Sequence, residues 1–223
     1  MLLPRSRLCC DIIGIRSFPG LVNREQDYQE QVLQKFKDFS AKPIINLESA
    51  TVHPLQSLAD AITIDELKTK ANPKIVLTWA PHVKALPQSV ANSFASWMLK
   101  WGADLTIANP EGYDLCTDFT QGAKIVHDQD VALADADFVY CKNWSSYQSY
   151  GNIIPVKQDW QVTAEKMSLT DSGKFMHCLP VRRNLVVSDD VLNSSETSVV
   201  IQQASNRVYS AAAVLNQMLD SEC

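Results

Sequence analysis

The 223-residue sequence lacks the features by which several common classes of protein are recognised. Its seven glycines form neither a Gly-x-Gly-x-x-Gly run nor a Walker-type phosphate loop, so a nucleotide-binding protein is not indicated. No apolar stretch approaches the ~20 residues needed to span a bilayer. A net charge of −5, without any block rich in Lys and Arg, gives no reason to expect a nucleic acid. We therefore expect a globular protein with neither a membrane nor a nucleic acid as its partner.

The six cysteines and four histidines do not have the spacing of a metal site. Neither Cys-x-x-Cys nor His-x-x-His occurs, so structural zinc and a redox disulfide are not indicated, and no cofactor is expected. The first residues carry two positive charges, but Asp11 interrupts the apolar run that follows, which argues against a signal peptide. We predict a cytoplasmic protein with free thiols.

Apolar runs of strand length alternate with stretches of helical periodicity along the chain. Strands are predicted at residues 9–16, 43–47, 74–79, 104–108, 124–127, 137–141, 174–178 and 198–202. Helices are predicted at residues 23–39, 54–70, 89–100, 128–134 and 206–219. This alternation is typical of an α/β protein with a doubly wound, mostly parallel sheet and flanking helices.

Four polar clusters each follow a predicted strand. They are His53–Gln56 (HPLQ), Ala80–His82 (APH), Lys142–Trp144 (KNW) and His177–Asn184 (HCLPVRRN). Ligands of open α/β sheets sit just beyond the carboxyl ends of the strands. The four clusters therefore predict a single pocket at that edge of the sheet.

The first cluster has the chemistry of an anion or carbonyl site. His53 stands at a predicted helix N-terminus, where Pro54 suits the first turn, and Gln56 follows so that both side chains can face one ligand. Exposed N–H groups and the positive end of the helix dipole favour negative charge there. The alternative is that His53 only caps the helix while Gln56 is solvated.

Two arginines are further candidates for anion binding. Arg16 ends a buried-looking strand, and Arg207 opens the last predicted helix, where a guanidinium could hold a phosphate or carboxylate through two bonds. Taken singly, Arg16 would more often form a surface salt bridge, and Arg207 would more often be a solvated charge.

The last cluster offers backbone acceptors. Pro180 ends its strand and leaves the carbonyls of Cys178 and Leu179 without ladder partners, so that they could accept from an amide or amine. Cys178 as a nucleophile is disfavoured, because no His/Asn partner pattern of a thiol hydrolase is visible. The charged residues near the strand ends suit an amino-acid-like ligand with carboxylates and an amine. These are Glu48, His82, Lys142 and Arg182. His127 lacks a supporting motif and is expected to be structural.

These motifs together resemble those of the aspartate/ornithine carbamoyltransferase family. The pairing of His53–Gln56 (HPLQ) with His177–Pro180 (HCLP) is similar to the ornithine-type members. The sequences Thr78–His82 (TWAPH), Lys142–Trp144 (KNW) and Val181–Asn184 (VRRN) resemble more narrowly the branch that uses N-acylated ornithines. The resemblance covers almost the whole chain. It implies the second domain of a carbamoyltransferase together with the tail of the first.

The resemblance implies transfer of a carbamoyl group from carbamoyl phosphate to the δ-amine of an N-acylornithine in arginine biosynthesis. By that resemblance, the carbamoyl-phosphate contacts are Arg16, His53, Gln56, Cys178, Leu179 and Arg207. The acylornithine contacts are Glu48, His82, Lys142, Leu179 and Arg182. Arg16, His53, Gln56 and Cys178 form the implied catalytic set. Arg and His would stabilise the carbonyl oxygen as it gains charge, while no residue would form a covalent bond.

One position bears on the acyl group. In the branch specific for N-acetylornithine, the resemblance leads us to expect a lysine two residues after Asn184, but Val186 stands there. This difference favours N-succinylornithine over N-acetylornithine.

The resemblance also implies an upstream segment that this sequence does not contain. Family members carry a Ser-x-Arg-Thr-Arg loop for the phosphate, and nothing like it occurs here. We expect residues 1–50 to be the remnant of a carbamoyl-phosphate domain, 51–203 the acylornithine domain, and 204–223 a helix that returns to the first domain. Roughly 100 residues would then be missing. The apolar face of that last helix would be exposed.

Three interpretations follow from that expectation. The first is a fragment of a carbamoyltransferase that is inactive alone, since one lost oxyanion donor already costs ~10²–10³ in rate. The second is a pseudoenzyme that binds an acylornithine-like ligand or a partner without catalysis. The third is a non-catalytic assembly module that keeps the oligomer surface of the family. The family also implies a homotrimer with active sites between subunits.

Overall fold

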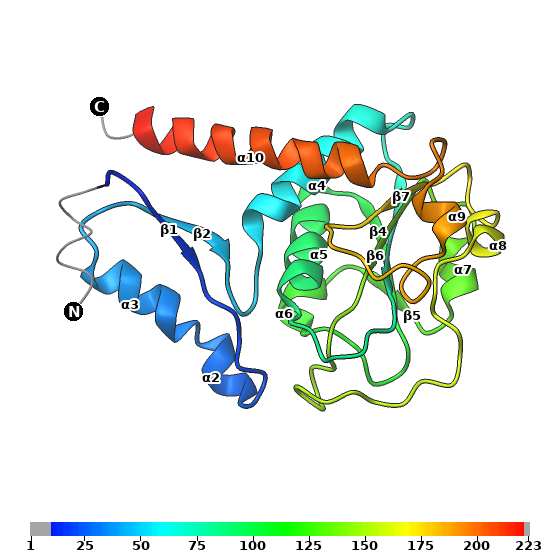
Figure 1. Ribbon diagram of the computed structural model, residues 1–223, viewed down its shortest axis with the longest axis horizontal. Coiled ribbons are helices and arrows are strands. Elements are labelled where there is room, and N and C mark those ends of the chain that lie inside the picture. The colour runs from blue at the N-terminus through cyan, green and yellow to red at the C-terminus, as the bar shows by residue number, and fades with distance from the viewer. Residues whose placement is uncertain (1–9, 221–223) are drawn as a thin grey trace.

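Two parallel sheets lie side by side in the computed structural model, which describes residues 10–220 (Figure 1). The smaller sheet pairs β1 (Ile13–Arg16) with β2 (Ile44–Glu48). The connection between these strands contains α2 (Arg24–Tyr28) and α3 (Gln31–Phe39). This part of the chain corresponds to the left-hand side of Figure 1, in dark and light blue.

The larger sheet has the strand order β5-β4-β3-β6-β7, and every neighbouring pair is parallel. Its strands are β3 (Lys74–Trp79), β4 (Asp104–Ala108), β5 (Lys124–Val126), β6 (Phe138–Lys142) and β7 (Lys174–Met176). The chain moves outward from β3 to β5 and then returns to the other side of β3 with β6. The strand order therefore reverses between β3 and β6, the point at which α/β sheets commonly bind ligands.

Helices cover both faces of this sheet, as Figure 1 shows. They are α4 (Pro54–Leu67), α5 (Ser89–Trp101), α6 (Thr117–Thr120), α7 (Gln129–Leu133), α8 (Ala164–Met167), α9 (Asp189–Leu192) and α10 (Val200–Asp220). The central strands β3 and β6 are buried along almost their whole length, so they read as continuous apolar runs rather than as alternating ones. The predicted fold class is confirmed.

The predicted helix at 23–39 is two helices. Glu30 takes a left-handed conformation with φ of 51°, which breaks the helix between α2 and α3. The Glu30 carboxylate then accepts bonds from the backbone N–H of Thr51, at 2.8 Å, and from its hydroxyl. This contact ties α3 to the turn that precedes His53 and α4.

The predicted strand at 198–202 is wrong. Only Ser198 forms an isolated bridge, with Phe175, and α10 begins at Val200 rather than at residue 206. The β-branched run of residues 199–201 favours a strand locally, but helical packing against α4 prevails. The first predicted strand is observed as β1 from Ile13, and its start at residue 9 lies outside the described residues.

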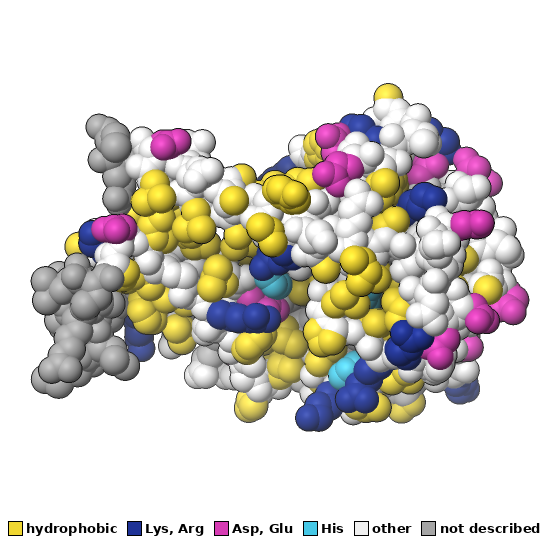
Figure 2. Space-filling model, turned by 45° about the horizontal axis from the view of Figure 1, so that its top comes forward, with side chains coloured by type: hydrophobic (Ala, Val, Ile, Leu, Met, Phe, Trp, Pro, Cys, Tyr) yellow, Lys and Arg dark blue, Asp and Glu magenta, His cyan; other side chains and the backbone are white. Residues whose placement is uncertain are grey.

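Helix α10 packs on α4 along its first half and continues beyond it above the smaller sheet (Figure 1). Large apolar side chains along α10 remain exposed, as expected. They include Val208, Tyr209, Leu215 and Leu219. Figure 2 shows hydrophobic side chains gathered on this left-hand side of the molecule. In residues 10–220, no helix is long and apolar enough to cross a membrane.

Candidate active site

An open pocket of about 770 Å³ lies where the strand ends of the two sheets face each other. Figure 2 shows basic, acidic and histidine side chains together in the hollow between the two parts of the molecule. Eight of the ten predicted site residues line this pocket: Arg16, Glu48, His53, Gln56, His82, Lys142, Cys178 and Leu179. The structure thus brings together residues from five separate segments of the sequence.

The two remaining predicted residues lie beside the pocket rather than in its wall. Arg182 donates from Nε to His82 Nε2 at 3.1 Å, so it reaches the rim through that imidazole. Arg207 lies on α10, half-buried, with its charge near Glu48, His53 and Asp60. Its Nη1 is buried without a hydrogen-bond partner among the residues that the structure describes.

Glu48 organises the polar wall of the pocket at the end of β2. Its buried carboxylate accepts from Arg16 Nη2 at 2.7 Å and from the Ser89 hydroxyl at 3.0 Å. Its Oε2 lies 3.7 Å from Nε2 of His53. The Arg16 side chain keeps 56% of its exposure while its partner is buried. The arginine therefore projects a cation into the pocket instead of forming an ordinary surface pair.

His53 is a neutral side chain that faces the pocket. It makes no side-chain capping bond to α4, and Pro54 occupies the first turn of that helix. Burial, together with the nearby charges of Arg207 and Arg16, lowers the pKa of His53 to about 3. The imidazole can therefore donate one hydrogen bond and accept another at neutral pH. Gln56, expected in one alternative to be solvated, is buried.

The turn after β7 is held by a buried histidine. The backbone N–H of His177 donates to Gln203 Oε1 at 2.9 Å, and its Nδ1 accepts from the N–H of Leu179 at 2.9 Å. Within residues 10–220, neither the Cys178 nor the Leu179 carbonyl accepts a hydrogen bond. Burial raises the pKa of the Cys178 thiol, which disfavours the thiolate that a nucleophile needs.

Replacing His177 with asparagine is expected to weaken the loss of stability in acid. Burial lowers the pKa of His177 to about 3, from an ordinary value near 6.5, so the unfolded chain binds one more proton between these values. This histidine's contribution is present above pH ~6.5 and is lost as the pH falls toward 3, at about 1.4 kcal/mol per pH unit. Asparagine Oδ1 can still accept from Leu179.

The measurement is the free energy of unfolding in urea at several pH values for both proteins. The curve of His177→Asn should fall less steeply below pH ~6.5, by about that slope. Parallel curves would show that His177 gains its proton at the same pH in the folded protein as in the unfolded chain. Comparing the two proteins cancels the other titrating groups.

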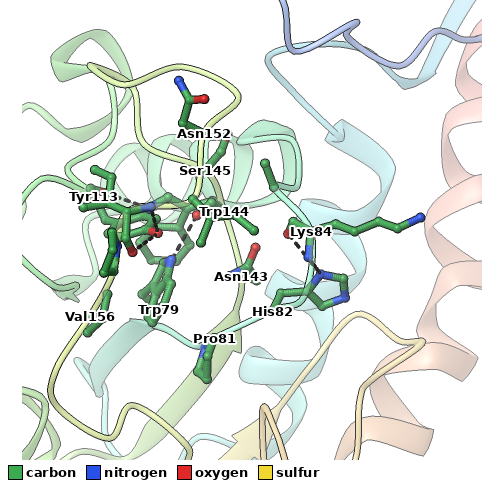
Figure 3. Close-up of a pocket in the computed structure, with 14 residues that line it drawn as sticks. Trp79, Pro81, His82, Lys84, Tyr113, Asn143, Trp144, Ser145, Asn152 and Val156 are labelled. Atoms are coloured by element: carbon green, nitrogen blue, oxygen red, sulfur yellow. Dashed lines mark hydrogen bonds between the residues drawn. The ribbon is translucent and has the colours of Figure 1, made fainter.

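A second, smaller pocket of about 170 Å³ adjoins the first and shares His82 and Lys84 with it (Figure 3). Its wall is largely apolar and includes Trp79, Tyr113 and Trp144. Trp79 donates from Nε1 to the carbonyl of Trp144 at 2.9 Å, and Trp144 donates from Nε1 to the carbonyl of Tyr113 at 2.7 Å. In Figure 3 the Lys84 side chain extends away from these rings. The KNW motif therefore serves both pockets, with its lysine in one and its tryptophan in the other.

Sequence reasoning missed several residues at the site. Phe18, Lys84 and Ser89 line the main pocket, and Asp60 lies directly behind Gln56. Only Asp60 left a usable signal, since it follows Gln56 by four residues and therefore shares its helix face. His127, expected to be structural, is outside the pocket and bonds through Nδ1 to the carbonyl of Asn109.

Comparison with known proteins identifies this arrangement as a transcarbamylase fold. A crystal structure of N-acetyl-L-ornithine transcarbamylase superposes with a TM-score of 0.87 at 32% identity, covering 97% of this chain and 72% of that one. The family model described as "Aspartate/ornithine carbamoyltransferase, Asp/Orn binding domain" matches residues 86–218. The chain belongs to the aspartate/ornithine carbamoyltransferase family.

Similar proteins include members of the N-acylornithine branch. The N-succinylornithine carbamoyltransferase of Bacteroides thetaiotaomicron is 49% identical over 213 residues, which are 95% of this chain and 67% of that protein. The N-acetylornithine carbamoyltransferase of Xanthomonas axonopodis pv. citri is 36% identical, covering 92% of this chain and 65% of that protein. The chain therefore spans about two thirds of the length of these relatives.

Proposed function

We propose that this chain takes part in carbamoyl transfer from carbamoyl phosphate to the δ-amine of an N-acylornithine, a step of arginine biosynthesis. The observation that carries the proposal is the convergence of eight predicted residues on one pocket. The names of the relatives from Bacteroides and Xanthomonas support the same reaction. The two proposed substrates, carbamoyl phosphate and an N-acylornithine, are small molecules. The pocket residues supply hydrogen-bond donors, acceptors and charges that suit both of them.

The carbamoyl group would be held by a set of donors and acceptors at one end of the pocket. Neutral His53 and the Arg16 cation would donate to the carbonyl oxygen, which gains negative charge as the amine attacks. Gln56 and the carbonyls of Cys178 and Leu179 would accept from the carbamoyl NH₂. Arg207 would bind the phosphate through its guanidinium. Nη1 of this group has no hydrogen-bond partner among the residues that the structure describes.

The reaction requires no covalent intermediate on the protein. The δ-amine of the substrate forms a bond to the carbamoyl carbon, the bond from that carbon to the phosphate oxygen breaks, and phosphate leaves. The amine loses a proton in the process, and the departing phosphate can accept it. The protein's contribution is to position the two substrates and to stabilise the oxyanion.

The acylornithine would lie against the charged rim of the pocket. Lys142 and His82 line the pocket, and Arg182 is bonded to His82, so these groups can receive the substrate carboxylates. Among the described residues that line the pocket, the acidic one is Glu48. Its carboxylate can face the nitrogen atoms of the substrate. Leu179 would contribute a carbonyl to both substrates.

We further propose N-succinylornithine as the acceptor. Val186 stands where the acetyl-specific branch is expected to have a lysine, and its aliphatic side chain, which is buried, supplies no charge to the site. The higher identity to the Bacteroides protein, 49% against 36%, supports the same choice. A cation-lined rim also suits an acyl group that ends in a carboxylate.

The test is an assay for the ureido product with carbamoyl phosphate and N-succinyl-, N-acetyl- or unmodified ornithine. Two forms are compared: this chain, and a chimera that adds the unmatched third of the Bacteroides thetaiotaomicron relative. Turnover in either form, fastest with N-succinylornithine, supports the proposal and defines the active form for further work. Ligand binding without turnover in both would instead favour a ligand-binding protein.

Replacing Cys178 with serine is expected to leave carbamoyl transfer within about tenfold of the unchanged protein. The raised pKa of the thiol argues against a thiolate, and the proposed contact at this residue is its backbone carbonyl, which serine retains. The assay of the active form decides between these roles. A loss of four orders of magnitude or more would indicate a covalent nucleophile.

The division of the chain and its assembly are proposed as well. The separate β1–β2 sheet supports a first unit at residues 1–50, with the acylornithine unit at 51–203 and a returning helix at 204–223. We propose a cytoplasmic homotrimer, which the family resemblance supports. Light scattering coupled to size-exclusion chromatography of the active form tests the trimer, and a monomeric mass contradicts it.

A further inference from the structure

A buried carboxylate behind the pocket is used by none of the steps above. Asp60 lies on α4, one turn after Gln56, and is fully buried. Its Oδ1 accepts two hydrogen bonds, from Gln56 Nε2 and from Gln203 Nε2, each at 2.7 Å. Its Oδ2 is buried and makes no further hydrogen bond among residues 10–220, but the Tyr140 hydroxyl lies near enough to help lower the pKa of the carboxyl. A buried carboxylate is costly unless it is satisfied, which indicates that these contacts matter to the molecule.

The chemistry of a carboxylate fixes the orientation of both glutamines. An ionised carboxylate can only accept, so each glutamine must turn its NH₂ toward Asp60 and its carbonyl oxygen away from it. For Gln56 the oxygen is then the atom left for the pocket that this residue lines. For Gln203 the oxygen accepts from the backbone N–H of His177.

We propose that Asp60 is a positioning residue that orients the Gln56 amide so that Oε1, rather than its NH₂, meets the NH₂ of the carbamoyl group. This inference rests on the proposed function, because that function assigns Gln56 to the carbamoyl group. Without Asp60 the Gln56 amide could rotate and bring two NH₂ groups face to face. Such a contact offers no acceptor and repels the ligand.

The same carboxylate connects three elements that carry the site. Through Gln203 it reaches the start of the turn at His177, and therefore the segment with the carbonyls of Cys178 and Leu179. Its charge also lies near the Arg207 guanidinium. Asp60 thereby couples α4, α10 and the end of β7. Burial raises the pKa of Asp60 to about 7. Both arms of the test below are therefore carried out about one pH unit above that pKa, where the carboxylate is ionised.

The first arm of the test observes the glutamine amides in the full chain without ligand. Nuclear magnetic resonance with ¹⁵N labelling detects side-chain NH₂ groups, and those that are buried and bonded exchange slowly with water. The signals of Gln56 and Gln203 should persist in the unchanged protein. In Asp60→Ala, which removes the acceptor, both should exchange at least about tenfold faster. Unchanged exchange of Gln56 overturns the proposal.

The matched control is Thr63→Val. Thr63 is also buried on α4 and also contacts α10, since its Oγ1 accepts from Asn206 Nδ2 at 2.9 Å, but it does not touch Gln56. This variant loses a buried bond between the same two helices. Its Gln56 exchange should match that of the unchanged protein within about twofold. Equal acceleration in both variants would reduce Asp60 to a general packing role and overturn the proposal.

The second arm measures the dissociation constant for carbamoyl phosphate by titration calorimetry. Asp60→Ala should weaken binding at least tenfold, whereas Asp60→Asn, which keeps an acceptor at Oδ1, should remain within about threefold. In a Gln56→Ala background, Asp60→Ala should add less than twofold, because Asp60 acts through Gln56. If Asp60→Ala weakens binding by the same factor in both backgrounds, Asp60 acts independently of Gln56 and the proposal is overturned.

The two arms separate the inference from the proposed function. If neither this chain nor the chimera binds carbamoyl phosphate, the proposed function fails, and the amide exchange still decides whether Asp60 holds Gln56. If binding is present but Asp60→Asn is as weak as Asp60→Ala, the charge of Asp60 acts directly. In that case the orienting role is wrong and the function stands.

Discussion

Replacing His53 with alanine is expected to lower the rate of carbamoyl transfer by about 10²–10³. The imidazole is buried, faces the pocket and is kept neutral by burial and by the charges of Arg207 and Arg16, which lower its pKa to about 3. A donor preorganised in this way stabilises the carbonyl oxygen without reorganising during the reaction. The measurement is kcat and KM for the ureido product in the active form.

The pH dependence and a control make this result specific. Because the folded pKa of His53 is far below neutrality, its protonation state does not change between pH 6 and 9, and the deficit of the variant should be constant there. His127→Ala is the matched control, since that imidazole bonds to Asn109 away from the pocket. A loss below tenfold in His53→Ala, or an equal loss in both variants, would contradict the assigned role.

Replacing Trp144 with alanine is expected to lower the free energy of unfolding by about 3–5 kcal/mol. The indole is fully buried, and its removal leaves a cavity beside the smaller pocket. It also leaves the Tyr113 carbonyl without the donor that Trp144 Nε1 supplies at 2.7 Å. Urea unfolding followed by circular dichroism measures the change.

Trp101→Ala provides the comparison for that result. Trp101 ends α5 with 43% of its surface exposed, and Lys68 lies over its ring at 5.0 Å. Removing it should cost about 1 kcal/mol or less, because an exposed cation–π contact contributes only about 0.5–1 kcal/mol. A loss of about 1 kcal/mol or less in Trp144→Ala as well would mean that the interior around Trp144 collapses to fill the space.

The strands and the pocket were predictable from sequence because each depends on local patterns. The runs before Ala80 and Lys142 are nearly all apolar, as a strand with both faces buried requires. Polar residues directly after such strands must lie at one edge of a parallel sheet. This argument holds for APH, KNW and HCLP, whose strands belong to the larger sheet. HPLQ follows β2 of the smaller sheet, so its place in the same pocket depends on how the two sheets meet.

What could not be predicted depends on contacts between distant segments. The start of α10 is set by Gln203, Asn206 and Ser210, whose polar side chains meet α4 at helical spacing, although residues 199–201 favour a strand. The break at Glu30 depends on a carboxylate that reaches Thr51. The position of Arg182 at the rim, where it donates to His82, depends on tertiary packing. The sequence therefore predicted that Arg182 belongs to the site but not that it lies at the rim.

The central position of β3 has a consequence for how the chain acquires its structure during synthesis. Strand β3 pairs on one side with β4, about 30 residues later, but on the other side with β6, where Ile75 is opposite Phe138. While the ribosome is still making the intervening residues, one edge of this buried apolar strand has no partner. Contacts so distant in sequence form slowly, and an unpaired apolar edge invites association with other chains. The nascent polypeptide is therefore most vulnerable to aggregation in the interval before β6 emerges.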